Sequence, residues 1–375
     1  MNVLMMVSWF DKVASAEGGG GFHYEQAVDL SKYCNCAIYY PYDRFIEDKF
    51  CSGIEGSVQV YRSKYKLENK LRNRLYMYSA MKKIVKDFEP DIIHAHVATE
   101  VGRFAIILGK LFHIPVIITE HSTVEASGVE TFPHYHYAKF AYGQSKYNAC
   151  VSDNLCKKVS AIFPNYSFHT VYNGISEMEP RNNMGKYRKE DAVNIGIVAG
   201  FYNRDIKGMQ FVLPALSNMK KDGYRVHLHV MGDGEYKQEF VELANELGID
   251  KQCTFYGNCK KDKLFDIVSE MDYVVSASIF ESFGCAVAEA AMLGKPIVAS
   301  RSGGVESIVT LKNGILVDKD SEDAIYRGLV EMYEKYKQYD GVQISKEARE
   351  KFGMTAISMK YLEIYKEAIE RYNNN

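Results

Sequence analysis

Short apolar runs rich in β-branched residues recur along the whole chain, with longer stretches between them whose apolar residues repeat at helical spacing. This alternation is typical of βαβ units, in which parallel strands form one sheet and helices cover both of its faces. The sequence therefore predicts an α/β fold with two doubly wound sheets in tandem. The predicted strands are residues 2–8, 37–40, 91–95, 116–120, 149–152 and 169–172 in the first half, and 194–199, 227–232, 254–257, 273–277, 296–300 and 314–317 in the second.

The chain has 375 residues, a length that suits two domains of about 150–200 residues each. The segment 176–191 is polar throughout and lacks an apolar period, so it is the predicted linker. We expect domains over 1–178 and 190–355. Residues 356–375 form a predicted amphipathic helix that could cross back to the first domain to bury its apolar stripe.

Composition excludes several classes of protein. A formal net charge of −2 gives no overall basic field for nucleic acid. The apolar start of the chain has no basic residues or cleavage site, which favours a first strand over a signal peptide, and no apolar run is long enough to span a membrane. The eight cysteines lack C-x-x-C pairs, so free thiols in a reducing cytoplasm are expected. The predicted location is cytoplasmic, with an optional peripheral position on the inner face of the membrane.

The segment 273–306 carries the strongest chemical signal. A buried strand leads through Gly284 into a helix, and a helix start presents free N–H groups that bind phosphate. Glu281 and Glu289 flank this point; they would repel phosphate, but they suit neutral sugar hydroxyls. The helix is otherwise apolar, and a lone carboxylate there needs a partner or a ligand. From spacing alone, two solvated surface carboxylates are the alternative.

The Glu-x7-Glu stretch from Glu281 to Glu289, with residues 294–299 and 303–306 after it, resembles glycosyltransferase family 4. Further segments match the family in order along the chain: 91–96, 119–121, 173–175, 231–234 and 254–257. The resemblance spans roughly residues 1–370. It implies the GT-B fold, in which two Rossmann-like domains face each other across a cleft. It also implies a retaining enzyme that uses a nucleotide sugar, with a UDP-sugar as the default donor.

The family places a basic pair on the donor pyrophosphate, after the first strand of the second domain. In this chain Lys207 fits that pattern, whereas Phe201 replaces the usual arginine, and Arg204 is the expected substitute. Fixed cations suit this place because the leaving diphosphate gains negative charge as the glycosidic bond breaks.

The resemblance assigns further roles. Glu281 would bind the donor sugar, Glu289 the ribose, and His121 the sugar from the first domain. Taken alone, His121 is more often a structural histidine, as we expect for His23 and His94, although His96 could face the cleft. The remaining expected donor-binding residues are Ser282, Phe283, Gly284, Gly232, Tyr256, Gly20 and Gly21.

Metal chemistry has little support in the sequence. Asp318-Lys319-Asp320 is formally a D-x-D motif, but its polar surroundings favour a helix cap. No His/Cys cluster has zinc spacing. We therefore expect no essential metal and no cofactor beyond the nucleotide-sugar donor.

Basic and apolar residues alternate across residues 61–86 and predict a basic amphipathic helix on the acceptor side. Either the helix packs on the core with a solvated basic face, or it contacts an anionic membrane or a lipid-diphosphate acceptor. The basic residues are Arg62, Lys64, Lys66, Lys70, Arg72, Arg74, Lys82, Lys83 and Lys86.

Together these features predict a retaining hexosyl- or N-acetylhexosaminyltransferase that acts on a carbohydrate or lipid-linked acceptor in polysaccharide or glycoconjugate assembly. No carboxylate is clearly placed as a nucleophile, which favours a front-face route. A GT-B-fold sugar-nucleotide epimerase is one alternative. A non-catalytic transferase-like partner protein is the other, and the presence of Glu281, Glu289 and Lys207 argues against it. The sequence identifies neither sugar, base nor acceptor.

Overall fold

The computed structural model describes residues 1–10, 21–65, 70–177 and 185–374. The chain divides into two compact units. Unit 1 is Met1–Gly174 together with Met354–Asn375, and unit 2 is Ile175–Gly353. Unit 2 is thus inserted between two parts of unit 1. The predicted linker 176–191 lies partly outside the described residues.

Unit 1 contains, among its described residues, an eight-stranded sheet of order β3-β4-β2-β1-β5-β6-β7-β8. All neighbours are parallel except β3 and β4, which form an antiparallel pair that was not among the predicted strands. The strands are β1 (Asn2–Met6), β2 (Asn35–Asp43), β3 (Phe50–Glu55), β4 (Val58–Lys64), β5 (Ile92–His96), β6 (Val116–Glu120), β7 (Asn148–Cys150) and β8 (His169–Thr170).

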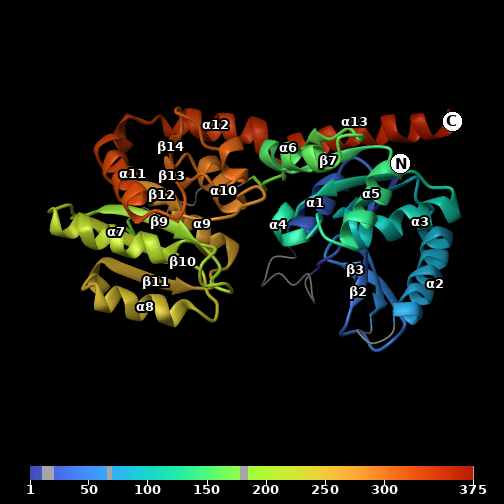
Figure 1. Cartoon of the computed structure of the whole chain (residues 1–375), viewed down its shortest axis with the longest axis horizontal. Coiled ribbons are helices and arrows are strands. Elements are labelled where there is room, and N and C mark those ends of the chain that lie inside the picture. The colour runs from blue at the N-terminus through green and yellow to red at the C-terminus, as the bar shows by residue number, and fades with distance from the viewer. Residues whose placement is uncertain (11–20, 66–69, 178–184, 375) are drawn as a thin grey trace. The chain divides into compact units, whose positions relative to one another are not determined.

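The helices of unit 1 cover this sheet, and the last of them comes from the far end of the chain (Figure 1). The apolar stripe of α13 packs into the core of unit 1 through Ile357, Tyr361 and Tyr365, and α13 contacts α1. The helices are α1 (Gly21–Leu30), α2 (Lys70–Phe88), the π-helix η1 (Ala98–Gly102), α3 (Arg103–Phe112), α4 (Val124–Ser127), α5 (His134–Gln144), α6 (Asp153–Ile162) and α13 (Met354–Asn373).

The helix predicted over residues 61–86 is wrong in its first part. Arg62 and Lys64 lie in β4, and Arg62 is buried. Its guanidinium lies 2.7 Å from Asp43 and 2.8 Å from Glu55. Alternation of basic and apolar residues fits a strand as well as a helix, and two carboxylates make burial of the arginine possible.

Unit 2 has, in its described part, a six-stranded parallel sheet of order β11-β10-β9-β12-β13-β14. The chain builds the sheet outward from β9 in one direction and then from β12 in the other. Loops that follow these two strands therefore leave in opposite directions, which opens a crevice where ligands bind in such sheets. The strands are β9 (Val193–Val198), β10 (Val226–Met231), β11 (Cys253–Gly257), β12 (Tyr273–Ser276), β13 (Ile297–Ser300) and β14 (Gly314–Val317).

The helices of unit 2 flank its sheet on both faces (Figure 1). Ser321 caps α11, since its side chain accepts a hydrogen bond from the Ala324 amide. The cap predicted at Asp318-Lys319-Asp320 is therefore the residue directly after this stretch. No helix in the described residues combines the length and hydropathy needed to cross a membrane. The helices are α7 (Met209–Lys221), α8 (Lys237–Glu246), η2 (Asp250–Gln252), α9 (Lys261–Ser269), α10 (Cys285–Met292), η3 (Gly304–Ser307), α11 (Glu322–Lys335), η4 (Tyr336–Gln338) and α12 (Gly341–Phe352).

Candidate functional site

Two loops meet at the crevice of unit 2, one after β9 and one after β12. The Lys207 ammonium lies 2.5 Å from a carboxylate oxygen of Glu281, with both side chains partly exposed at 30% and 19%. The backbone supports this pair, because the Ile279 amide donates a hydrogen bond of 2.8 Å to the Ile206 carbonyl. The structure thus brings together two of the predicted site residues, which lie 74 positions apart in sequence.

Gly208 allows the two loops to approach this closely. Its φ of +71° is in the left-handed region, and a Cβ atom there would lie 2.0 Å from the Ala277 carbonyl oxygen. Only glycine avoids both the strain and the clash. The glycine beside Lys207 therefore positions the lysine.

Glu281 is held at its backbone and at its side chain. Its amide donates to the Ser302 carbonyl at 3.0 Å, and its own carbonyl accepts from the Gly304 amide at 2.8 Å. The Ser278 hydroxyl donates to the carboxylate at 2.9 Å. Such a fixed, partly exposed carboxylate is suited to accept hydrogen bonds from ligand hydroxyls.

The helix α10 begins directly after this loop. Gly284 precedes it with a φ of +98°, and Phe283 is buried against Phe352. The first amides of a helix lack partners within the helix, so this start can bind an anion. Ser282 lies half-buried in the connecting loop, and Glu289 lies one turn into α10, also half-buried.

Arg204 lies on the same β9 loop but makes other contacts. In the described part of the chain, its ion pairs are with Glu239 of α8 and with Asp205, and its side chain is 45% exposed. Phe201 is fully buried and packs against Phe240. A cation at position 201 would be buried in the core, where it would need a charged partner.

The strands β10 and β11 contribute Gly232 and Tyr256. Gly232 has a φ of +151°, and a Cβ atom there would lie 1.7 Å from the Ala199 carbonyl oxygen. The Tyr256 hydroxyl lies 2.9 Å from Nδ1 of His229, and the two rings stack. Gly232 thus lets the end of β10 approach the end of β9. The Tyr256 side chain contacts His229 of the neighbouring strand β10.

In unit 1, three buried histidines lie together at the carboxyl ends of the strands. His23 comes from α1, His96 ends β5 and His121 follows β6. Their nearest ring nitrogens all lie within 4.8 Å of one another, and His96 Nδ1 is 2.8 Å from His121 Nε2. Only His121 was predicted as a site residue from the sequence. The other two lie beside the reversal of strand order between β1 and β5, which the structure reveals and the sequence alone does not.

The histidine cluster offers polar atoms to a ligand. Both ring nitrogens of His23 and Nε2 of His96 are buried and have no hydrogen-bond partner in the described structure. Burial lowers the pKa of all three rings, in His121 to about 3 despite a hydrogen bond with Asn173 that raises it. The rings are therefore neutral at pH 7 and can each donate and accept a hydrogen bond.

The spacing of these histidines can be compared with that of metal ligands. Two nitrogens bound tetrahedrally to one zinc ion at about 2.0–2.1 Å lie about 3.3 Å apart. The 2.8 Å separation of His96 and His121 is shorter and is that of a hydrogen bond. The geometry is that of a hydrogen-bonded pair with a third ring beside it.

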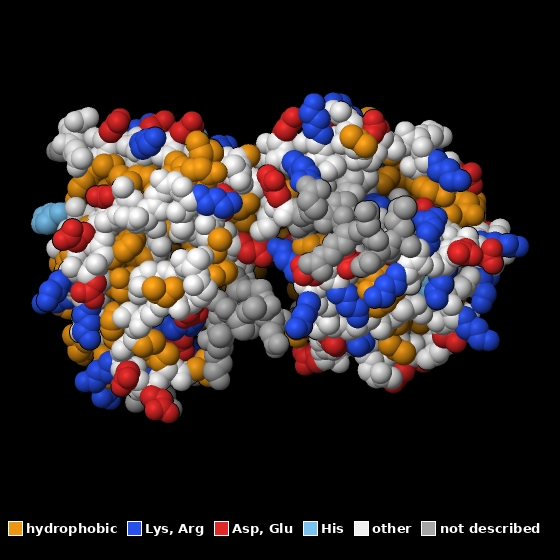
Figure 2. Space-filling model, turned by 180° about the vertical axis from the view of Figure 1, so that it is seen from behind, with side chains coloured by type: hydrophobic (Ala, Val, Ile, Leu, Met, Phe, Trp, Pro, Cys, Tyr) orange, Lys and Arg blue, Asp and Glu red, His pale blue; other side chains and the backbone are white. Residues whose placement is uncertain are grey.

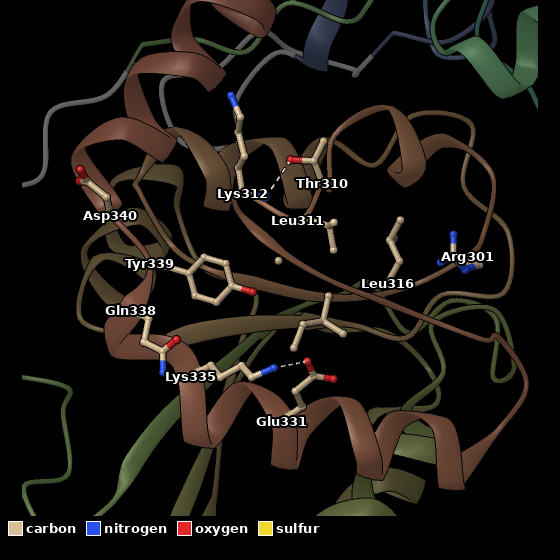
Figure 3. A pocket seen from close by; sticks show the side chains of 12 residues that line it. Arg301, Thr310, Leu311, Lys312, Leu316, Glu331, Lys335, Gln338, Tyr339 and Asp340 are labelled. Atoms are coloured by element: carbon tan, nitrogen blue, oxygen red, sulfur yellow. Dashed lines mark hydrogen bonds and ion pairs between the residues drawn. The ribbon is translucent and has the colours of Figure 1, made fainter.

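Gly20, one of the two expected first-domain glycines, lies outside the described residues. Gly21 is the first residue of α1. The cavity drawn in Figure 3, of about 730 Å³, lies elsewhere in unit 2, beside β14 and α11. Its described lining includes the ion pair of Lys335 and Glu331 but none of the predicted site residues.

Comparisons with known proteins agree with this architecture. Residues 38–177 match the family model described as Glycosyltransferase Family 4, and residues 181–356 match the model described as Glycosyl transferases group 1. An uncharacterised glycosyltransferase of Methanocaldococcus jannaschii is 25% identical over 98% of both chains. A second one from the same organism is 26% identical, over 60% of this chain and 62% of its own length.

Among solved structures, that of Anabaena HepE in complex with UDP superposes with a TM-score of 0.76 at 17% identity, over 97% of this chain and 99% of HepE. At this identity the likeness shows the fold, which is a pair of parallel-sheet α/β domains. The two family models follow each other along most of the sequence. The chain therefore belongs to glycosyltransferase family 4 and has the GT-B fold.

Proposed function

We propose that this glycosyltransferase moves a hexosyl or N-acetylhexosaminyl group from a nucleotide-sugar donor, UDP-linked by default, to an acceptor hydroxyl with retention at the anomeric carbon. The pair of Lys207 and Glu281 beside the start of α10 is the observation that carries the proposal. This place combines a cation, the free amides of a helix start and a carboxylate that can accept hydrogen bonds from sugar hydroxyls. The likeness to HepE, whose solved complexes hold UDP and UDP-glucose, supports the choice of donor.

In this proposal Lys207 and the amides around Phe283 and Gly284, next to Ser282, hold the diphosphate. Arg204 joins them when it exchanges Glu239 for the ligand. Glu289 binds the ribose hydroxyls. Glu281 binds the donor sugar.

The reaction needs no nucleophile from the protein. The bond between the anomeric carbon and the phosphate oxygen breaks, and the acceptor oxygen attacks from the same face. The leaving phosphate oxygen takes the proton of the acceptor hydroxyl. Lys207 stabilises the charge that develops on the diphosphate, and the neutral His121 ring hydrogen-bonds the sugar.

Removal of Lys207 tests the assignment. Lys207→Ala should lower turnover at least about 100-fold, because a fixed cation no longer stabilises the leaving diphosphate. The donor is found first, by a thermal-shift screen of UDP-, GDP- and ADP-sugars. Lys251→Ala, an exposed lysine elsewhere in unit 2, is the control and should retain full activity. Activity of Lys207→Ala within a few fold of wild type would refute the proposal.

We propose that the transfer proceeds without a metal ion, since Lys207 and the helix amides supply the positive charge. Activity should be unchanged after dialysis against EDTA in metal-free buffer. Loss of activity that returns with added Mn²⁺ or Zn²⁺ would contradict this, and the histidine cluster of unit 1 would then be the first place to examine.

The epimerase alternative predicts a different product. Incubation with the nucleotide sugar alone should give at most slow hydrolysis if the protein is a transferase. Appearance of the epimeric nucleotide sugar would instead establish the epimerase. A non-catalytic partner protein would give neither product, with or without acceptors.

We further propose that α2 and α3 contact an anionic membrane, the place of a lipid-linked acceptor. On α2, Leu71 and Leu75 are 69% and 60% exposed at adjacent turns, and on α3 Leu111 is also exposed. Figure 2 shows basic side chains with hydrophobic ones among them at the edge of unit 1 where α2 lies. Apolar side chains among basic ones fit a surface that inserts among anionic headgroups.

Liposome sedimentation tests this contact. Binding should require anionic lipid, and Leu71→Ser with Leu75→Ser should weaken it. The same double change at Val342 and Met359, exposed apolar residues of other helices, is the control. Equal, negligible binding to neutral and anionic liposomes would refute the contact.

A further inference from the structure

A second cavity, of about 260 Å³, lies within unit 1. Its walls come from the ends of β2 and β4, from α2, and from the first residues of α3 and α5. It therefore opens at the carboxyl ends of parallel strands, where ligands bind in this class of sheet. Its volume is below the roughly 300 Å³ at which drug-sized pockets begin, so it suits about one sugar ring.

The charge of this cavity is positive. Arg74 and Arg103 both line it, and its described lining residues include no Asp or Glu. The Arg103 guanidinium carbon lies 3.7 Å from the ring centroid of Tyr137 and 4.8 Å from that of Phe104. The Arg74 guanidinium carbon lies 6.0 Å from the ring centroid of Phe104. Aromatic faces hold these cations in place without neutralising their charge.

Polar atoms of two side chains in the cavity wall carry the argument, because they have no hydrogen-bond partner in the described structure. They are Nε of Arg103 and Nδ1 of His134, and both atoms are buried. A buried donor without a partner is unfavourable unless a ligand or water satisfies it. Both atoms belong to residues that line the cavity. Nε of Arg103 always carries a proton, so a ligand in the cavity can supply the acceptor that it lacks.

We propose that this cavity binds an anionic group, phosphate or carboxylate, on the sugar of the acceptor. This inference rests on the proposed transferase function and specifies its acceptor class. The arginine forks match the paired oxygens of either anion, and Tyr137 and Phe104 offer apolar faces to a sugar ring. The donor diphosphate has its own cation, Lys207, in unit 2.

Titration calorimetry with the full chain, saturated with UDP, measures the binding of three probes. The probes are glucose 1-phosphate, glucuronate and the neutral methyl glucoside. At least one anionic probe should bind at least about tenfold more tightly than methyl glucoside, and the stronger of the two distinguishes phosphate from carboxylate. Arg103→Gln should weaken that binding at least about tenfold, as should Arg74→Gln, whose exposed side chain makes misfolding no concern. Arg72→Gln, on α2 but outside the cavity lining, should change it less than about twofold.

The proposal is overturned if neither anionic probe binds more tightly than methyl glucoside, or if binding is unchanged in both cavity variants. It is also overturned if binding is lost in Lys207→Ala but kept in Arg103→Gln, because the probe would then bind at the donor site. UDP binding is measured separately in every variant. If UDP binds and the anionic probes do not, only the acceptor class is wrong. If UDP and the nucleotide sugars do not bind, the transferase proposal fails first.

Discussion

At the scale of single residues, the candidate donor site depends on glycines as much as on charges. At Gly208 and at Gly232 a loop packs so closely against a neighbouring backbone carbonyl that a Cβ atom would collide with it. The Lys207 ammonium then lies 2.5 Å from a carboxylate oxygen of Glu281. Close backbone packing thus determines where the charges lie.

Gly208→Ala should destabilise unit 2 through both strain and collision. A left-handed backbone costs about 1–2 kcal/mol for an alanine, and the contact with Ala277 adds about 1–3 kcal/mol. Gly223→Ala is the matched control, because Gly223 has a φ of +88° but open space around its Cβ position. Unfolding in urea, followed by circular dichroism, should show the larger loss for Gly208→Ala. Equal losses would mean that the close approach at Gly208 has no energetic consequence.

The sequence predicted some of these residues and not others, for physical reasons. Lys207 and Glu281 sit in loops after strands and match motifs of the family that the chain resembles, so the motifs were enough to select them. The partner of Arg204 could not be predicted, because Glu239 lies on the helix α8, far from this loop in sequence, and surface ion pairs follow no spacing rule. Selecting His23 and His96 requires the strand order of unit 1, which depends on pairing between distant segments and which no local pattern reveals.

At the scale of elements, α13 packs on the sheet of unit 1 through polar as well as apolar contacts. The Tyr365 hydroxyl lies 2.8 Å from His94 Nδ1, and the Tyr361 hydroxyl lies 2.9 Å from Thr119 Oγ1. His94 Nε2 in turn lies 2.7 Å from Thr119 Oγ1. The amphipathic period predicted that this helix buries a stripe. It did not reveal the polar partners, which lie on β5 and β6 and are apparent only once the helix is docked.

Tyr365→Phe should lower the stability of unit 1 by about 1–3 kcal/mol, because it leaves a buried histidine nitrogen without its partner. Tyr33→Phe makes the same chemical change at an exposed position and should be nearly neutral. The urea concentration at the midpoint of unfolding, measured for each variant, shows which of the two changes lowers stability. A Tyr365→Phe variant as stable as wild type would show that the hydroxyl contributes nothing to docking of the helix.

At the scale of the whole molecule, the four buried histidines of unit 1 make stability depend on pH. Burial lowers the pKa of His23, His94, His96 and His121, in His121 to about 3. In the unfolded chain each binds a proton near pH 6.5, so the unfolded state takes up more protons below that pH. The stability these groups contribute is full above about pH 6.5 and decreases as the pH falls towards the folded pKa values.

The free energy of unfolding should therefore fall between about pH 6.5 and 5, with a slope of up to about 1.4 kcal/mol per pH unit for each such histidine. His94→Gln should make the slope shallower, whereas His136→Gln, at an exposed position, should leave it unchanged. Urea unfolding at several pH values gives the slopes. A wild-type stability that is flat over this range would contradict the pKa shifts.

The division into two doubly wound sheets was predictable from the alternation of strands and helices, because that pattern is local. The insertion of unit 2 into unit 1 was harder to predict, since the destination of α13 depends on a surface formed by residues more than two hundred positions earlier.

The return of α13 to unit 1 has a consequence for synthesis of the chain. The ribosome releases β5 and β6 long before it releases Tyr361 and Tyr365, and translation of unit 2 in between takes on the order of 10–40 s. Unit 2 is contiguous and can fold as it emerges. Unit 1 begins first but must wait for the last helix, so the nascent chain finishes its second unit before its first.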